Sequence, residues 1–228
     1  MTSHHAKPYK YLMFLVAAFI SCYLTQEILL NRLTSIGPGY ITGGTFIYFT
    51  SPLILDIVSE VYGYKVARQL LWCGLGALLF MAFCVGIVLK MPYPTFWTVV
   101  VVSYKKALSS LVRTAVISTL TVSIGQLVNA YLISRWKILT RGKYFWLRSM
   151  GASITGDSTT VVLTTLGTFM GRIPNNMFMQ NLVPELVIMV TFTAIGAIPA
   201  AFIANKLKKN EHLDNYDTNI NYNPFKLI

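Results

Sequence analysis

The fold is decided by the stretch Ser51-Pro-Leu-Ile-Leu-Asp-Ile-Val-Ser-Glu-Val-Tyr-Gly-Tyr-Lys-Val-Ala-Arg68. Its two carboxylates, Asp56 and Glu60, close a run (residues 33–55) that has no charged residue and is long enough to cross a bilayer. At this spacing they share one helix face, where like charges repel by about 0.2–0.5 kcal/mol. An Asp at the centre of an inserted helix costs about 2.5 kcal/mol or more. We therefore expect the pair to face the bundle interior and to form half of a polar site.

Composition identifies the class of protein. Of the 228 residues, 54% are hydrophobic and 12% are charged, whereas soluble domains carry about 25% charged residues. The net charge of +11 comes from short basic clusters between apolar runs, where such residues set membrane topology. The sequence therefore predicts an integral membrane protein whose partner is the lipid bilayer and not a nucleic acid.

Apolar runs predict six membrane spans, since about 20 residues are needed per crossing. The segment 91–104 is apolar but broken by Pro92 and Pro94, and we expect it to lie at the membrane interface. The fold class is thus an all-α membrane protein with one six-helix transmembrane domain (residues 1–206) and a polar cytoplasmic tail (residues 207–228) that we expect to be disordered. The predicted spans are residues 9–30, 40–61, 69–89, 107–134, 147–171 and 183–205.

The distribution of Lys and Arg predicts the orientation. With the N-terminus inside, twelve basic residues flank the spans on the cytoplasmic side and five on the outer side. This asymmetry follows the positive-inside rule. We expect a multi-pass protein of the bacterial inner membrane with both termini in the cytoplasm.

The polar residues within or near the spans are the candidate site. Gln126 and Asn129 share a helix face, where amides either join helices or bind a heterocycle edge. Arg113 either extends to the interface or offers a fork to a carboxylate. Asp157 lies among small residues and needs a partner such as Arg113, whereas Glu27 is interpreted as an interfacial acid. The predicted substrate-binding residues are Asp56, Glu60, Arg113, Gln126, Asn129, Arg148 and Asp157.

Signatures of catalysis are absent from the sequence. It has no Gly-x-Ser-x-Gly, His-Glu-x-x-His or Walker sequence. Its three cysteines are scattered through apolar runs without metal-ligand spacing. We expect no enzymatic activity, no metal and no cofactor.

Several motifs resemble those of the queuosine precursor transporter family, also called the vitamin uptake transporter family. They are Asp56-x-x-x-Glu60-Val-Tyr-Gly-Tyr-Lys-x-Ala-Arg68, Arg113, Gly125-Gln126, Trp146-Leu-Arg148 and Ala152-Ser-x-x-Gly156. Their spacing agrees from about residue 45 to 170. The resemblance implies import of 7-cyano-7-deazaguanine, 7-aminomethyl-7-deazaguanine or queuine for salvage into tRNA modification. It also implies a fold similar to the substrate-binding subunits of energy-coupling-factor transporters.

This chain departs from the family pattern at three positions. Asn129 stands where the family often has Asp, Thr160-Val161 replaces an Asp-Ser/Thr pair, and Met189 replaces a Lys. The preferred deazaguanine therefore stays open, as do the driving force and the oligomeric state. The alternative function is that of a substrate-binding subunit of a vitamin transporter that depends on an external ATPase module. The partner is then that module, and a homodimer is the other partnership considered. A third interpretation is a non-transporting scaffold whose acids join helices.

We expect Asp56 and Glu60 to have different roles. Glu60 precedes Lys65 and Arg68 and should be neutralised structurally. Asp56 has no cation nearby in sequence, so it should accept hydrogen bonds from the amino-pyrimidinone edge of a deazaguanine.

Overall fold

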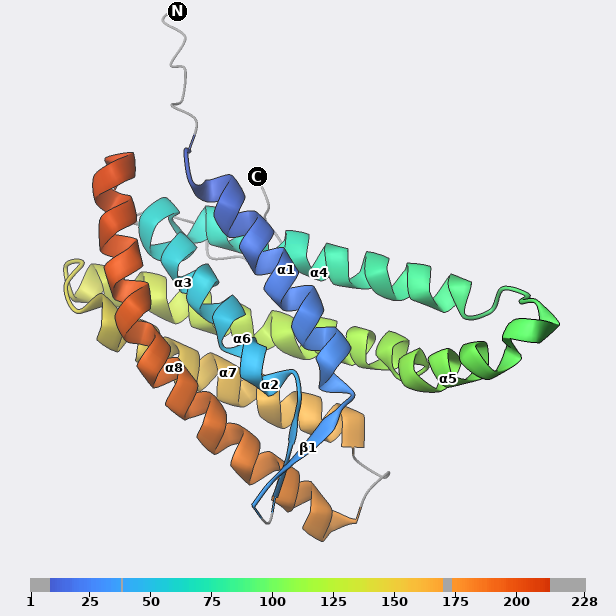
Figure 1. Cartoon of the computed structure of the whole chain (residues 1–228). Coiled ribbons are helices and arrows are strands. Elements are labelled where there is room, and N and C mark those ends of the chain that lie inside the picture. Colours follow the sequence, from blue (N-terminus) through green and yellow to red (C-terminus); the bar gives the residue numbers. More distant parts are fainter. Residues whose placement is uncertain (1–8, 38, 170–173, 214–228) are drawn as a thin grey trace, which may run out of the picture.

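The structure is a bundle of helices with one short hairpin (Figure 1). This computed structural model describes residues 9–37, 39–169 and 174–213, and for residues 175–177 the backbone only. The elements are α1 (Leu12–Leu30), β1 (Leu33–Ile36), β2 (Gly39–Thr42), α2 (Thr45–Tyr48), α3 (Thr50–Tyr62), α4 (Tyr64–Val88), η1 (Thr95–Trp97), α5 (Thr98–Leu108), α6 (Leu111–Leu139), α7 (Phe145–Phe169) and α8 (Asn175–Glu211).

The stretch that dominates the sequence is also the centre of the bundle. Every residue of α3 from Ser51 to Tyr62 is buried, and α3 packs against α1, α4, α6 and α8. Gly63 ends α3 with φ of 92° and starts α4 directly. A positive φ of this kind is readily adopted only by glycine. Because α3 is covered on all sides, its two acids must find partners inside the protein.

The second predicted span begins later than expected. Residues 40–42 belong to β2, which pairs antiparallel with β1 in the register Leu33↔Thr42 to Ile36↔Gly39. The prediction that residues 40–61 form one continuous helix is therefore wrong. Gly37, with φ of 56°, lies in the hairpin turn, and two glycines at positions 43 and 44 follow β2 before α2 begins. The glycine-rich sequence favours a turn over a helix because glycine loses the most conformational freedom in a helix.

Helices α6 and α7 are antiparallel and approach most closely at a pair of glycines. A side chain at Gly125 would meet the backbone oxygen of Gly156 and the hydroxyl of Thr160. Small residues permit this close backbone contact between helices in membranes. The contact sets the register of the two helices. It therefore fixes which polar residues of α6 lie opposite which polar residues of α7.

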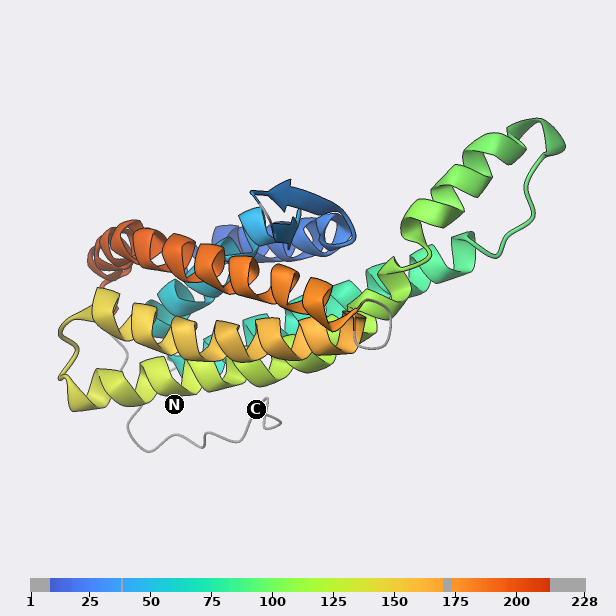
Figure 2. The same cartoon turned by 90° about the horizontal axis from the view of Figure 1, so that it is seen from below.

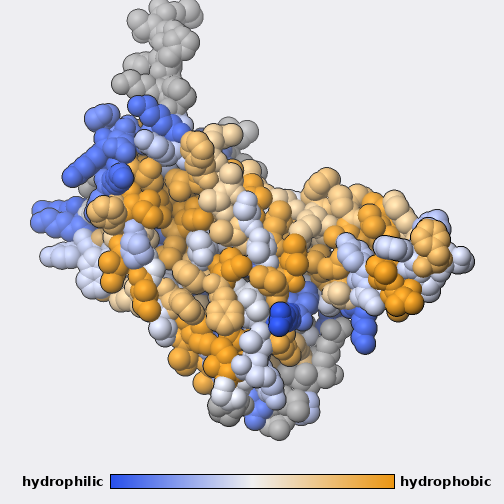
Figure 3. Space-filling view, in the orientation of Figure 1, coloured by the Kyte–Doolittle hydropathy of each residue, from blue (hydrophilic) through white to orange (hydrophobic). Residues whose placement is uncertain are grey.

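The bundle has two different ends and an arm. At the basic end, exposed Lys and Arg side chains surround the α6–α7 connection and the end of α8, which explains the hydrophilic surface there in Figure 3. The hairpin end is the opposite one, with β1, β2, the end of α7 and the start of α8 (Figure 1). The last turns of α4, with η1 and α5, project from the bundle as an arm (Figure 2).

The chain is an all-α membrane protein. Four helical segments among the described residues are long and apolar enough to cross a membrane, namely Leu12–Leu30, Tyr64–Val88, Thr95–Leu139 and Phe178–Glu211. Of the predicted tail, residues 207–211 continue α8, and residues 214–228 lie outside the described part of the chain.

Candidate functional site

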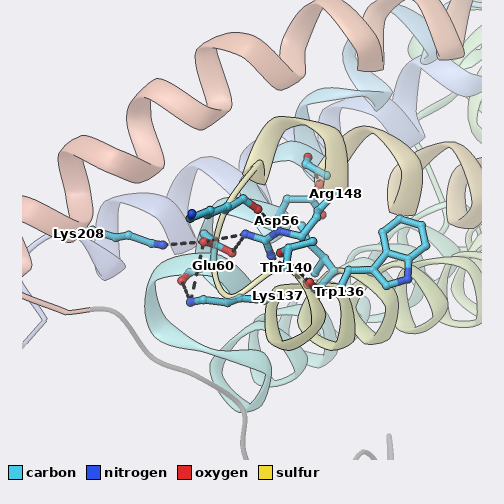
Figure 4. A network of polar contacts seen from close by, with 10 residues as sticks. Asp56, Glu60, Trp136, Lys137, Thr140, Arg148 and Lys208 are labelled. Carbon is cyan, nitrogen blue, oxygen red and sulfur yellow. Dashed lines mark hydrogen bonds and ion pairs between the residues drawn. The ribbon is translucent and has the colours of Figure 1, made fainter.

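At the basic end, Glu60 is the centre of a network of buried charges (Figure 4). Arg148 Nη2 lies 3.1 Å from both Glu60 oxygens, and Lys208 Nζ lies 2.6 Å from Oε1. Lys137 Nζ lies 3.9 Å from Oε1 and donates to the Glu60 backbone oxygen at 2.8 Å. One carboxylate thus joins α3 to α6, α7 and α8. The predicted structural neutralisation of Glu60 is present, and Lys137, Arg148 and Lys208 contribute to it from α6, α7 and α8.

One turn further into the bundle, Asp56 is surrounded by neutral donors. Asn129 Nδ2 donates to Asp56 Oδ1 at 2.7 Å. The hydroxyls of Ser149 and Ser153 both donate to Oδ2. Asp56 is only 1% exposed. Its carboxylate is therefore satisfied within the protein, by donors from α6 and α7.

A third polar layer lies next to Asp56, towards the hairpin end. Asp157 Oδ1 accepts from Gln126 Nε2 at 2.9 Å and from the Tyr48 hydroxyl at 3.3 Å. The predicted proximity of Arg113 and Asp157 is wrong. Arg113 is exposed, and its Nη2 donates to the backbone oxygen of Gly167 at 3.4 Å.

The helix register explains this error. Because Gly125 lies against Gly156, Gln126 and not Arg113 is level with Asp157. Gly125 follows Arg113 by twelve positions in α6. At a rise of 1.5 Å per residue, the two residues are about 18 Å apart along the helix axis.

A larger cavity opens beyond the Asp157 layer, towards the hairpin end. The space free of atoms is about 610 Å³, including its open mouth. Residues from α1, β2, α2, α6, α7 and α8 form its walls, so six segments must assemble to make it. Its polar lining residues are Gln26, Glu27, Thr42, Thr45, Tyr48, Ser118, Thr160, Thr164, Thr165, Thr168 and Glu185.

Two buried carboxylates dominate the chemistry of this cavity. Glu185 Oε1, on α8, accepts from the hydroxyls of Thr42 and Thr45 at 3.1 and 3.0 Å. Glu27 Oε1, on α1, accepts from the Ser118 hydroxyl at 3.2 Å. Among the described residues, the cavity lining includes neither Lys nor Arg. The described lining therefore carries acids and hydroxyls without a compensating cation, which suits a ligand rich in hydrogen-bond donors.

The structure brings together most of the predicted site residues but places them outside this cavity. Glu60 and Arg148 are in the basic-end network, Asp56 and Asn129 form the next layer, and Gln126 and Asp157 form the third. Gln126 also lines a smaller cavity beside the large one, together with Tyr48. That the seven residues bind substrate stays a prediction.

Sequence reasoning missed Glu185 and underestimated Glu27. Glu185 lies within the predicted sixth span, and an acid inside a span is itself a signal of function. Glu27 is buried, and its interpretation as an interfacial acid does not fit its contact with Ser118.

Comparison with known proteins agrees with these features. Residues 42–204 match the family described as "Putative vitamin uptake transporter". A protein of Bacillus subtilis (strain 168) with the name "Probable queuosine precursor transporter" is 24% identical over 172 residues, which cover 75% of this chain and 74% of that protein. No solved structure matches the chain. The family and the relative indicate a membrane transporter and not an enzyme, and the chain belongs to the vitamin uptake transporter family.

Proposed function

We propose that this transporter imports a 7-deazaguanine precursor of queuosine and binds it in the cavity between Glu27 and Glu185. The observation that carries the proposal is the pair of buried carboxylates on different walls, without a cation among the lining residues that the structure describes. The relative's name supports the substrate class, as does the resemblance of the motifs around Asp56.

The hydrogen-bonding groups of a 7-deazaguanine complement this lining. Its amino-pyrimidinone edge presents N1–H and N2–H side by side, which one carboxylate can accept as a pair. The opposite side presents the pyrrole N–H and, in two of the three candidates, an amine on the 7-substituent. The threonine and serine hydroxyls can donate to O6. A site built for these groups rejects analogues that lack them, because its own polar groups would be left unpaired.

Aromatic contact adds to this recognition. Tyr48 lines the cavity from α2 and offers a ring to a planar base. Stacking of this kind contributes about 1–3 kcal/mol per base in nucleic-acid proteins.

We further propose six spans with both termini in the cytoplasm of a bacterial cell. The two polar segments α2–α3 and α7 cross the membrane with the four apolar ones, because they fill the interior of the bundle. The basic end then faces the cytoplasm, in keeping with the positive-inside rule, and the cavity faces outward. Asp56, Glu60 and Arg148 hold the helices together below it.

Complementation tests this function. A bacterial strain that cannot make queuosine receives the gene and is fed each of the three bases, and queuosine in tRNA is measured. We expect queuosine with the wild-type chain and with Glu211→Gln, a substitution of a partly exposed acid at the end of α8. Glu185→Gln should reduce it. No queuosine from any base, with the protein present in the membrane, would contradict the proposal.

Purified protein in lipid vesicles distinguishes the alternative. Uptake by this chain alone indicates an independent importer. Binding without uptake indicates a substrate-binding subunit that depends on an external ATPase module.

A further inference from the structure

Three buried oxygen atoms in adjacent polar layers lack a donor. They are Asp157 Oδ2, Gln126 Oε1 and Asn129 Oδ1, each without a hydrogen-bond partner within the described part of the chain. Asp157 and Asn129 are 0% exposed and Gln126 is 3% exposed. A buried acceptor without a donor costs about 1–3 kcal/mol. The described part of the chain therefore leaves three acceptors close to one another without a donor.

The orientation of the two amides is determined by the carboxylates beside them. Gln126 Nε2 donates to Asp157, and Asn129 Nδ2 donates to Asp56. Turning either amide over would place its oxygen against a carboxylate oxygen. The amide oxygens are therefore the atoms left over. Gln126 and Asn129 lie at i and i+3 on α6, on the face that packs against α7 at Gly156 and Asp157.

Within the described ranges of the chain, the ionisable groups around Asp157 do not supply a cation. Tyr48 of α2 donates a neutral hydroxyl, and Asp56 of α3, which holds the amide of Asn129, would add a second negative charge. On α8, Glu185 lies with Thr160 on the cavity wall. The basic residues of α6, α7 and α8 that face the interior are Lys137, Arg148 and Lys208, and each contacts Glu60.

We propose that Asp157, Gln126 and Asn129 form an exchangeable proton site that couples proton entry to substrate import. A proton on Asp157 Oδ2 turns that oxygen from an acceptor into a donor and removes the buried charge, in a layer whose remaining unpartnered atoms are acceptors. A hard metal cation such as Ca²⁺ takes six to eight oxygens, twice or more what this layer offers. The coupling to import rests on the function proposed above, whereas the proton site does not.

Tyr48 provides the connection between the two sites. Its hydroxyl donates to Asp157 Oδ1, while its side chain also lines the substrate cavity. A base bound against Tyr48 therefore changes the contacts of the residue that holds the proton. This contact is the physical basis for coupling.

Infrared spectroscopy tests the proton site without substrate. In lipid at neutral pH, a protonated carboxylic acid gives a C=O stretching band distinct from that of a carboxylate. We expect wild type and Glu211→Gln to show a band that is missing from Asp157→Asn. In Asp157→Asn an amide N–H takes the place of the proton, so the variant imitates the protonated state. We expect this variant to insert into the membrane. An identical band in wild type and Asp157→Asn would overturn the proposal.

Vesicle uptake tests the coupling with labelled 7-aminomethyl-7-deazaguanine. With the interior one pH unit more alkaline, one proton per substrate permits about tenfold accumulation. We expect wild type to accumulate the base and to lose accumulation with a protonophore, and Asp157→Asn to equilibrate without accumulation. Accumulation that persists with the protonophore, or that requires Na⁺, would overturn the coupling and leave the proposed function standing. Failure to take up any of the three bases would instead overturn the proposed function, and the infrared band would still decide the proton site.

Discussion

Glu60 and Glu185 are both buried glutamates, yet their surroundings are opposite. Glu60, at the basic end, contacts Arg148, Lys137 and Lys208. Glu185, at the hairpin end, accepts only from the hydroxyls of Thr42 and Thr45 within the described structure. A buried charge that already has its counter-charges is stable and closed to ligands. A buried acid with neutral donors and open space beside it is costly until a ligand or a proton completes it.

The largest expected effect is the loss of Glu60. Glu60→Gln leaves two lysines and an arginine without their shared carboxylate. Breaking a buried pair from one side costs about 3–5 kcal/mol. We expect the free energy of unfolding to fall by that amount, measured by denaturant titration in detergent. Uptake per folded molecule should stay near wild type.

Glu211→Gln is the control for this change, because it removes a partly exposed acid near the same end. Equal stability of Glu60→Gln and wild type would show that the network does not hold the helices together.

A glutamate-to-glutamine substitution at the hairpin end should weaken substrate binding. Glu185→Gln keeps the shape of the side chain but removes the charge that accepts from a ligand. Hydrogen bonds to charged groups contribute about 1.5–3 kcal/mol, so we expect affinity for the base to fall at least about tenfold. Binding of labelled base to the purified protein measures this. If Glu185→Gln instead lowers the unfolding free energy as much as Glu60→Gln does and leaves affinity unchanged, both glutamates are structural. The proposed difference between the two ends would then be wrong.

Asp56 tests where the boundary between the two regions lies. The sequence predicts that Asp56→Asn abolishes uptake, whereas the structure satisfies Asp56 with Asn129, Ser149 and Ser153. The new amide can accept from Asn129 through its oxygen and donate to the serine oxygens. Neutral hydrogen bonds then replace bonds to a charged group, so we expect a loss of about 1 kcal/mol in unfolding free energy. Thermal unfolding and uptake are measured on the same sample. Abolished uptake at full stability would place Asp56 in the substrate site after all.

The helices could be predicted from the sequence because they depend on local properties. Runs without charge located α1, α4, α6 and α7 to within about five residues at each end, whereas α8 extends beyond the predicted sixth span at both ends. The hairpin was missed because residues 40–44 are apolar enough to continue a span, although their glycines favour a turn. Hydropathy alone does not distinguish these outcomes.

The site was less predictable because it depends on helix register and on contacts between distant segments. Spacing within a helix correctly put Gln126 and Asn129 on one face. It carried no information on which residue of α7 faces them. The sequence therefore paired Asp157 with Arg113, whereas in the structure Asp157 contacts Gln126. Glu185 meets Thr42 and Thr45 across more than a hundred residues of sequence. Only the general rule that an acid inside a membrane span is costly and marks a functional site could have identified Glu185 from the sequence.

The smallest expected effect concerns Tyr48, which touches both the cavity and the Asp157 layer. Tyr48→Phe keeps the ring in the cavity wall and removes one neutral donor, 3.3 Å from Asp157 Oδ1. A hydrogen bond of this kind contributes about 0.5–1.5 kcal/mol, so unfolding free energy should fall by no more than that, and affinity for the base should change little because stacking is retained. Accumulation driven by a pH gradient should fall more than affinity, because the connection between base and proton is lost. Equal losses in affinity and accumulation would mean that the hydroxyl contacts the base itself, and that cavity and Asp157 layer form one site.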